Sequence, residues 1–127
     1  MPGAIRVLFI DDQQDFVQPL SYWMMNKGFE VLTAFDGPTG INHVKDKLCD
    51  IVFLDYKMPG MDGAAVLEKI RSFDKTIPVI LVTSYLDDAL ASATREMNIT
   101  GFFSKMGNFE ELEKVLRVAV MIVRSRG

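Results

Sequence analysis

Three aspartates stand where they could share one metal ion. Asp11 and Asp12 directly follow the apolar run 5–10, and Asp55 directly follows the apolar run 51–54. Carboxylates that crowd together raise one another's pKa unless a cation neutralises them. Oxygen-only ligands, without histidine or cysteine beside them, favour Mg²⁺ over zinc, and bound Mg²⁺ usually keeps positions open for phosphate oxygens. The aspartates therefore predict a magnesium site that handles phosphate.

Two more polar side chains stand near the ends of later apolar runs. Thr83 ends one such run and Lys105 closely follows another. A threonine hydroxyl can donate to a phosphoryl oxygen, and a lysine ammonium supplies a point charge for it. Aspartate can attack phosphorus to give an acyl phosphate. We expect Asp55 to be this nucleophile, because it stands alone after a central run, whereas Asp11 and Asp12 are adjacent and look like a metal-holding pair.

Five apolar segments predict the strands that would carry these residues. They lie at 5–10, 30–34, 51–54, 77–82 and 101–103. Four of them are continuous runs rich in Val, Ile and Phe, as strands buried on both faces of a parallel sheet require. The segment 30–34 is less apolar and suits the edge of a sheet.

Between these segments lie stretches with the spacing of amphipathic helices. The residues that we expect to face the core are Phe16, Val17, Leu20, Trp23 and Met24 in the first helix; Ile41, Val44 and Leu48 in the second; Val66, Leu67, Ile70 and Phe73 in the third; Leu86, Leu90, Ala93 and Met97 in the fourth; and Leu112, Val115, Leu116, Ala119 and Ile122 in the fifth. Gly28 predicts the end of the first helix, and Asn108 with Glu111 forms a capping-box pattern that begins the last. We expect Met25 and Phe29 to pack in or near the core.

Strand and helix alternate five times, which predicts an α/β fold. Right-handed crossovers place helices on both faces of a five-stranded parallel sheet, doubly wound in the flavodoxin-like (βα)5 order 2-1-3-4-5. Ligands of such sheets bind beyond the carboxyl ends of the strands, where the polar residues described above stand. No repeat or linker interrupts the pattern, so we expect residues 1–127 to form a single domain.

Composition narrows the classes of function. Of the 127 residues, 49% are apolar and 24% are charged, as in ordinary globular proteins. With a net charge of −3 the chain offers no broad positive field for a polyanion, so we expect no direct nucleic-acid binding. No stretch reaches the roughly 18 to 20 apolar residues of a membrane span, and Cys49 is the only cysteine. We expect a cytoplasmic protein whose partners are proteins.

The polar residues and their spacing resemble those of a response-regulator receiver domain. The match rests on Asp11 and Asp12, the segment 55–63 (Asp-Tyr-Lys-Met-Pro-Gly-Met-Asp-Gly), Thr83 with Ser84, and Lys105. Each piece alone is weak, but the identities and the spacing agree together. The resemblance covers the whole chain.

The resemblance implies a phosphorylatable switch. Asp55 would accept a phosphoryl group from a histidine kinase or a histidine phosphotransfer protein, and the domain would catalyse this transfer and its own slow dephosphorylation. Mg²⁺ would bind the side chains of Asp12 and Asp55 and the backbone carbonyl of Lys57. Asp11 would bind the ion mostly through water.

The resemblance also implies how the switch responds. Thr83 would move toward the phosphoryl group, Lys105 would pair with it, and Phe102 would turn inward. The packing of the fourth helix, the fifth strand and the fifth helix would change as a result. Lys57 and Tyr85 occupy the two positions that tune dephosphorylation, and such bulky side chains would screen the acyl phosphate from water.

One position departs from the family pattern. Receivers usually carry a proline after the site lysine, in a cis peptide, whereas Met106 follows Lys105 here. Because a cis bond before a residue other than proline costs about 3 to 4 kcal/mol, we expect a trans peptide and a different loop at this place.

The last helix carries two apolar residues outside its core face. Val118 and Met121 project opposite the face of Leu112 and Leu116, so they would be exposed in a monomer. Receivers use this surface for output, so we expect self-association or a partner contact there.

Three other functions remain to be compared with the switch. A phosphatase with an acyl phosphate after the first strand needs an Asp-x-Asp pattern, which Asp11-Asp12-Gln13 lacks. A flavin or dinucleotide domain needs a first turn rich in Gly, Ser or Thr, whereas this turn is acidic. A receiver-like module that binds partners without being phosphorylated stays open because of Met106, although the intact acidic set, Thr83 and Lys105 argue against it.

Overall fold

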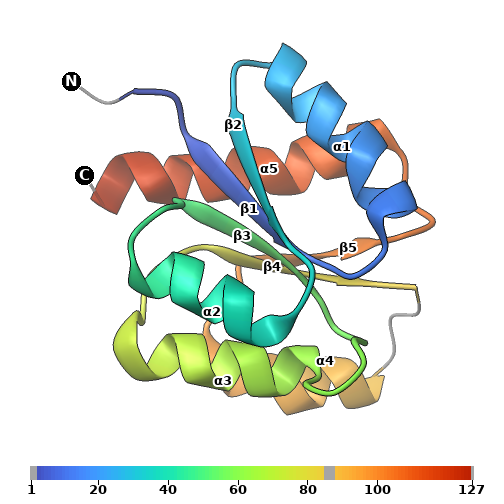
Figure 1. The fold of residues 1–127 in the computed structure, drawn as a ribbon, viewed down its shortest axis with the longest axis vertical. Coiled ribbons are helices and arrows are strands. Elements are labelled where there is room, and N and C mark those ends of the chain that lie inside the picture. The colour runs from blue at the N-terminus through green and yellow to red at the C-terminus, as the bar shows by residue number, and fades with distance from the viewer. Residues whose placement is uncertain (1–2, 85–87, 127) are drawn as a thin grey trace.

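The computed structural model describes residues 3–84 and 88–126, apart from the side chains of Ala89 and Ala93. Its five strands are β1 (Arg6–Ile10), β2 (Glu30–Ala34), β3 (Ile51–Asp55), β4 (Val79–Thr83) and β5 (Gly101–Ser104). They form one parallel sheet in the order β2-β1-β3-β4-β5, as the sequence predicts (Figure 1). β3 and β4 are buried along their whole length, whereas the edge strand β2 is largely half-exposed.

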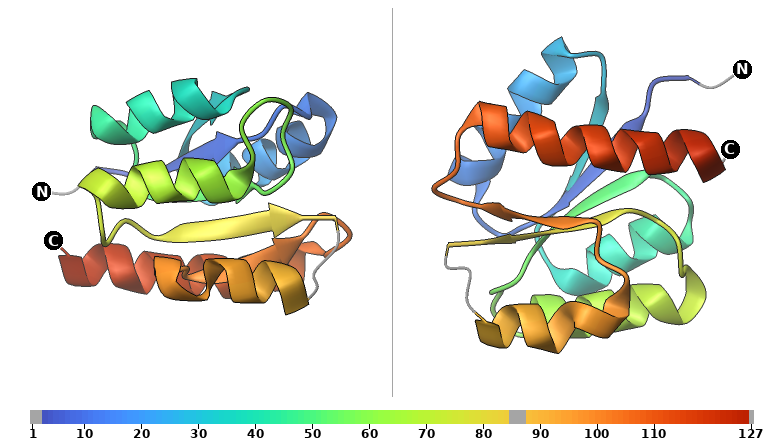
Figure 2. Two further views of the ribbon diagram at one scale, coloured as in Figure 1. Left: turned by 90° about the horizontal axis from the view of Figure 1, so that it is seen from below. Right: turned by 180° about the vertical axis from the view of Figure 1, so that it is seen from behind.

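The helices are α1 (Gln14–Asn26), α2 (Gly37–Lys45), α3 (Gly63–Phe73), α4 (Asp88–Thr94) and α5 (Phe109–Arg126), with a short 3-10 helix, η1 (Arg95–Met97), after α4. α5 lies across the sheet in the rear view of Figure 2. α1 and α5 pack on one face of the sheet, and α2 and α3 pack on the other, where Leu90 of α4 joins them. The doubly wound arrangement predicted from the alternating pattern is thus confirmed.

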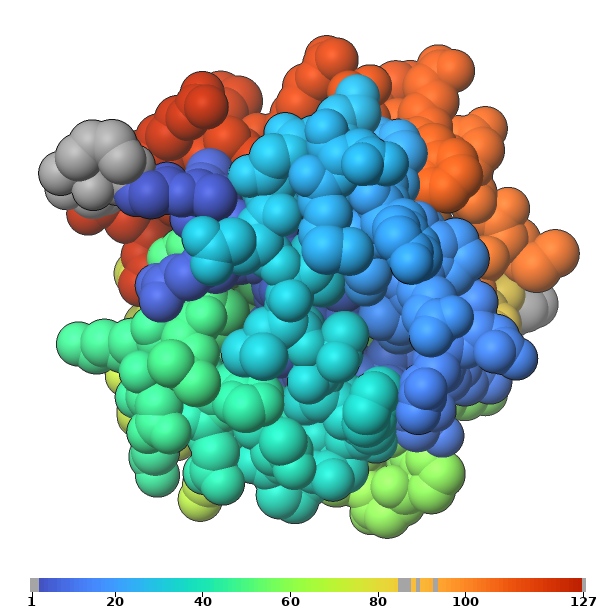
Figure 3. All heavy atoms as spheres, turned by 45° about the horizontal axis from the view of Figure 1, so that its top comes forward, coloured from blue at the N-terminus to red at the C-terminus, as the bar shows by residue number. Residues whose placement is uncertain are grey.

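Side-chain caps fix where several helices begin. The carboxylate of Asp36 accepts a hydrogen bond of 2.8 Å from the backbone N–H of Thr39 at the start of α2. Asn108 Oδ1 accepts one of 2.9 Å from the N–H of Glu111, which confirms the predicted start of the last helix. α5 then lies beside α1 (Figure 3). The rings of Trp23 and Phe109 stack there, with their centroids 5.5 Å apart.

Gly40 is a helix-weakening residue in the middle of α2, and its place in the fold explains it. A Cβ built on Gly40 would lie only 2.4 Å from Cδ1 of Ile10, a buried residue of β1. α2 therefore packs directly against β1, and only glycine permits this approach. Ile10 is the residue immediately before the aspartate pair, so this contact also supports the predicted site.

Three residues predicted to lie in the core are exposed instead: Met25, Leu48 and Phe73. α2 ends at Lys45, and Lys47 adopts a left-handed conformation with φ of 59°, so the helical spacing no longer applies at Leu48. Met25 lies away from the buried stripe of α1, and Phe73 is the last residue of α3, where the Lys45 ammonium covers its ring at 5.6 Å. Leu86, predicted for the fourth helix, lies outside the described residues.

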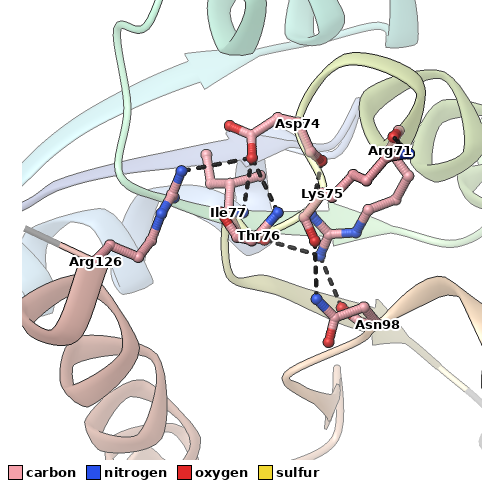
Figure 4. Close-up of polar contacts among 7 residues, drawn as sticks. All are labelled: Arg71, Asp74, Lys75, Thr76, Ile77, Asn98 and Arg126. Atoms are coloured by element: carbon pink, nitrogen blue, oxygen red, sulfur yellow. Dashed lines mark hydrogen bonds and ion pairs between the residues drawn. The ribbon is translucent and has the colours of Figure 1, made fainter.

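Arg71, near the end of α3, binds the two turns that precede β4 and β5 (Figure 4). Its guanidinium donates hydrogen bonds to the backbone carbonyls of Asp74 and Ile77, which precede β4, and to those of Met97 and Asn98, which precede β5. The end of α3 is therefore connected to both of these turns. The end of α3 and both turns lie at the amino ends of the strands, opposite the acidic residues that follow the carboxyl ends.

Among the helices of the described ranges, none is long and apolar enough to cross a membrane.

Candidate functional site

The fold brings the three aspartates together at the carboxyl edge of the sheet. Ile10 of β1 pairs with Leu54 of β3, so the residues that follow them, Asp11 and Asp55, emerge side by side. One carboxylate oxygen from each of Asp11, Asp12 and Asp55 lies within 4.8 Å of the others. Asp11 and Asp55 are buried, and Asp12 is exposed. We call these three residues the acidic cluster.

Lys105 reaches the acidic cluster from the end of β5. Its ammonium lies 3.1 Å from Oδ2 of Asp11 and 3.3 Å from Oδ2 of Asp55. The Lys105 side chain is only 10% exposed, so these ion pairs are largely shielded from water. One ammonium cannot balance three carboxylates, and the excess negative charge with its oxygen-only donors fits a hard divalent cation such as Mg²⁺.

Asp55 ionises less readily than an ordinary aspartate. Burial, followed by the charge of Asp11, raises the pKa of Asp55 to about 6, even though Lys105 acts in the opposite direction. Asp55 Oδ1 also accepts a weak hydrogen bond of 3.4 Å from the backbone N–H of Lys57. A cation bound at the acidic cluster would therefore stabilise the ionised form of Asp55.

Thr83 lies at the end of β4, one residue beyond the partner of Asp55 in the neighbouring strand. It is buried, and its backbone carbonyl accepts a hydrogen bond of 2.8 Å from the N–H of Lys105. The threonine, the lysine and the phosphoacceptor candidate therefore occupy adjacent strand ends. The structure brings together Asp11, Asp12, Asp55, Thr83 and Lys105, as expected from their positions after the strands.

The loop after β3 is held close to its own strand. A Cβ on Gly63, the first residue of α3, would lie 2.6 Å from Cα of Tyr56 and 2.8 Å from the carbonyl oxygen of Asp55. The neighbouring Asp62 caps α3 by accepting a bond of 2.9 Å from the N–H of Ala65. Lys57 is exposed in this loop, whereas Tyr85, the other residue predicted to tune dephosphorylation, lies outside the described residues.

The residues predicted for signal output lie outside the acidic cluster. Phe102, on β5, is half-buried and packs against the core on the side of α2 and α3. Val118 and Met121 are exposed on α5, Met121 to 68%, as predicted from the spacing of the helix.

The loop after Lys105 agrees with the expected departure from the family pattern. Among the described residues no peptide bond is cis, so the bond between Lys105 and Met106 is trans. Met106 is 85% exposed, and its backbone N–H donates to the Ser104 hydroxyl at 3.1 Å.

Two residues that the sequence analysis did not assign to the site contact Lys105. Oε1 of Gln13 accepts a hydrogen bond from the Lys105 ammonium, and the ring of Phe16 lies 4.8 Å from it. Phe16 was expected only in the core face of the first helix. A signal for Gln13 does exist in the sequence: it directly follows the aspartate pair at the position before a helix, where Ser, Thr, Asp or Asn is usual.

Comparison with known proteins agrees with this geometry. The sequence matches the family model of the response regulator receiver domain over residues 7–117. The chain therefore belongs to the response regulator receiver domain family, which serves two-component signalling.

Individual relatives are similar over most of the chain. It is 26% identical, over 98% of its length, to the transcriptional regulatory protein ZraR of Salmonella typhimurium, of which it spans only 28%. It is 27% identical to sporulation initiation phosphotransferase F of Bacillus subtilis, with 88% of this chain and 90% of that protein covered. The solved structure of chemotaxis protein CheY4 of Vibrio cholerae superposes with a TM-score of 0.84 at 27% identity, covering 91% of this chain and 98% of that one.

Proposed function

We propose that this receiver domain is a phosphorylatable switch in which Asp55 accepts a phosphoryl group from a phosphohistidine donor, either a histidine kinase or a histidine phosphotransfer protein. The observation that carries the proposal is the convergence of Asp11, Asp12 and Asp55 on one point, with the ammonium of Lys105 beside them. The similarity to a protein named as a phosphotransferase, of which the chain spans 90%, supports the same chemistry. We also propose that residues 1–127 form one domain.

An oxygen of the Asp55 carboxylate would attack phosphorus and form the new O–P bond. The N–P bond to the donor histidine breaks and its electron pair stays on the imidazole nitrogen. The ring leaves as neutral imidazole because its other nitrogen carries a proton or because the freed nitrogen takes one from solvent. Lys105 would neutralise charge on the phosphoryl oxygens, and the Thr83 hydroxyl would donate to one of them. Each of these side chains comes from a different strand end, so the sheet itself orients the reactants.

Mg²⁺ would be held by the side chains of Asp12 and Asp55 and by the backbone carbonyl of Lys57, with Asp11 bound mostly through water. The ion would supply charge neutralisation for the attacking carboxylate and the phosphoryl oxygens. This role fits the raised pKa of Asp55, because a bound cation would stabilise the ionised carboxylate, which is the form that attacks phosphorus.

Signal output would follow from the response of Thr83 and Phe102. Movement of Thr83 toward the phosphoryl group would let Phe102 turn further inward and would alter the surface formed by α4, β5 and α5. Val118 and Met121 would then contact a second copy or an effector.

The test is phosphorylation by phosphoramidate, whose P–N bond resembles that of phosphohistidine, in the presence of Mg²⁺. Intact mass should increase by one phosphoryl group in the wild type and not in Asp55→Asn. Asp62→Asn is the matched control, because it removes a carboxylate from the same loop but keeps a residue that can cap α3. No mass gain in the wild type would favour the alternative, a receiver-like module that binds partners without phosphorylation.

A further inference from the structure

The ammonium of Lys105 has two kinds of partner. Asp11 and Asp55 belong to the acidic cluster, where a divalent cation would compete with the lysine for the same oxygens. Gln13 and Phe16 contact the same ammonium but come from the start of α1 and carry no charge. These two contacts do not depend on whether the carboxylates are shared with a metal.

Gln13 is placed for this contact rather than for capping the helix. It occupies the N-cap position of α1, yet its side chain makes no capping hydrogen bond. Instead, its backbone N–H donates to Oδ1 of Asp11 at 2.8 Å, and its side-chain oxygen accepts from Lys105. Glutamine is not among the residues that favour an N-cap, so the residue type is explained better by the lysine than by the helix.

Phe16 offers the face of its ring to the ammonium. It is half-buried and packs against the core formed between α1 and α5, which fixes the ring in place. The ammonium lies 4.8 Å from the ring centroid, within the range of a cation–π contact. Such a contact is strengthened when the cation is withdrawn from water, as the 10% exposed Lys105 side chain is.

The loop that follows Lys105 does little to orient the side chain. Met106 is 85% exposed, and its backbone N–H donates to the hydroxyl of Ser104. The direction of the lysine side chain therefore depends on what its ammonium touches.

We propose that Gln13 and Phe16 are positioning residues for Lys105: they keep its ammonium at the acidic cluster when a divalent cation takes the carboxylates and repels it. This inference rests on the proposed function, in which Lys105 binds the phosphoryl group on Asp55. Like charges near one site repel, so without a second pair of contacts the flexible lysine would move into solvent when the cation binds. With them, the ammonium stays within reach of the incoming phosphoryl oxygens.

The first experiment uses NMR of protein carrying ¹³C-labelled lysine, without any phosphodonor. Ring currents of Phe16 should move the Lys105 Hε signal upfield from those of the other lysines, and the signal is identified by its loss in Lys105→Arg. The upfield shift should persist when Mg²⁺ is added to the wild type and to Phe16→Tyr, and should be lost in Phe16→Leu. In Gln13→Ala it should survive without Mg²⁺ and shrink with it. Loss of the shift in Mg²⁺-saturated wild type, or no effect of Phe16→Leu, would overturn the proposal.

The second experiment separates positioning from general structural damage. With phosphoramidate and Mg²⁺, Gln13→Ala and Phe16→Leu should each slow phosphorylation of Asp55 by about 3-fold to 10-fold, and Phe16→Tyr should restore the rate. In a Lys105→Ala background neither substitution should slow the reaction further, because both act through the lysine. Equal slowing in both backgrounds would show that the residues act elsewhere. If the wild type takes up no phosphoryl group, the proposed function fails while the NMR experiment still decides the positioning.

Discussion

Nη2 of Arg71 donates a hydrogen bond of 2.7 Å to the backbone carbonyl of Asn98, and this contact connects α3 to the turn before β5 across 27 residues of sequence. The same guanidinium also binds the carbonyls of Asp74 and Ile77, at 3.1 and 2.8 Å. Asn98 in turn donates from its side chain to the carbonyl of Lys75 at 2.9 Å. The side chains of Arg71 and Asn98 thus donate to backbone carbonyls in the turns that precede β4 and β5 (Figure 4).

We expect Arg71→Met to lower the free energy of unfolding by about 3 kcal/mol, because it leaves several partly buried carbonyls without donors. The free energy of unfolding of Arg71→Lys should lie between those of the wild type and Arg71→Met, since an ammonium cannot reach all of the carbonyls at once. Urea unfolding measures both. Arg117→Met is the control: that side chain is 74% exposed, and its change should stay within about 0.5 kcal/mol. A similar loss for both arginines would contradict the role given to Arg71.

Without a divalent cation, the buried Asp55 should make the protein less stable as pH rises. Its pKa in the folded protein is about 6, above its ordinary value of 3.8, so the native state binds more protons than the unfolded state between these values. The free energy of unfolding contributed by Asp55 is therefore highest below pH 3.8 and is lost as pH rises through 6. In Asp55→Asn the free energy of unfolding should not fall in this way. Above pH 6 this variant should be more stable than the wild type, by on the order of 2 to 3 kcal/mol.

Urea unfolding in EDTA from pH 4 to pH 8 measures this difference. Added Mg²⁺ should stabilise the wild type at neutral pH and stabilise Asp55→Asn much less, because the ion binds the folded carboxylates. If wild type and Asp55→Asn keep the same difference in stability across the whole range, the stated pH dependence is wrong.

Gly63→Ala should disturb the start of α3 and the site together. The added methyl group would meet backbone atoms, Cα of Tyr56 and the carbonyl oxygen of Asp55, which cannot rotate away. We expect a loss of about 2 kcal/mol or more in thermal unfolding, together with weaker Mg²⁺ binding. Gly3→Ala is the control, because nothing lies within 4 Å of the position of its Cβ. Unchanged Mg²⁺ affinity in Gly63→Ala would separate this loop from the site.

Phosphorylated protein should lose its phosphoryl group slowly, with a half-life longer than seconds. Lys57 is exposed in the loop beside Asp55, where its long side chain would screen the acyl phosphate from water. Lys57→Ala should shorten the half-life, which intact mass measured over time after removal of the donor would record. A wild-type half-life below one second, or a longer one in Lys57→Ala, would reject this role.

Met121→Glu should weaken any self-association of the phosphorylated protein. Met121 is 68% exposed on α5 and lies near Val118, so a charge there would oppose an apolar contact. Analytical ultracentrifugation of the beryllofluoride-treated and untreated protein measures the change. Ser125→Glu adds the same charge one turn further along the helix and should have a smaller effect; equal effects would point to net charge rather than to Met121.

The fold could be read from the sequence because its strands are continuous apolar runs and its helices carry a clear period. Core residues were predicted wrongly where the backbone leaves the helix before the helical spacing of apolar residues ends. Lys47 is an example, because its left-handed backbone removes Leu48 from the helix. Gly40 could be seen only as a weakness, since the approach of Ile10 depends on how α2 and β1 pack.

The site could be assembled because its members follow the strands directly, so topology alone brings Asp11, Asp55 and Thr83 together. Gln13 and Phe16 were missed for a physical reason. Their contacts depend on the path of the long Lys105 side chain, which no spacing along the sequence records. The hydrogen bonds of Arg71 were missed likewise, because backbone carbonyls are present at every residue.

The two oxygens of Asp11 already serve different parts of the protein. Oδ1 accepts from the first backbone N–H before α1, at 2.8 Å, and Oδ2 faces the ammonium of Lys105 at 3.1 Å. An ion that coordinates Asp11 directly would have to break one of these bonds, whereas an ion that reaches it through a water molecule leaves the bond to Gln13 in place and weakens the pair with Lys105 only through charge repulsion. The carboxyl group of Asp11 thus serves both the start of α1 and the charge balance of the acidic cluster. A substitution at Asp11 that is meant to change one of them will also change the other.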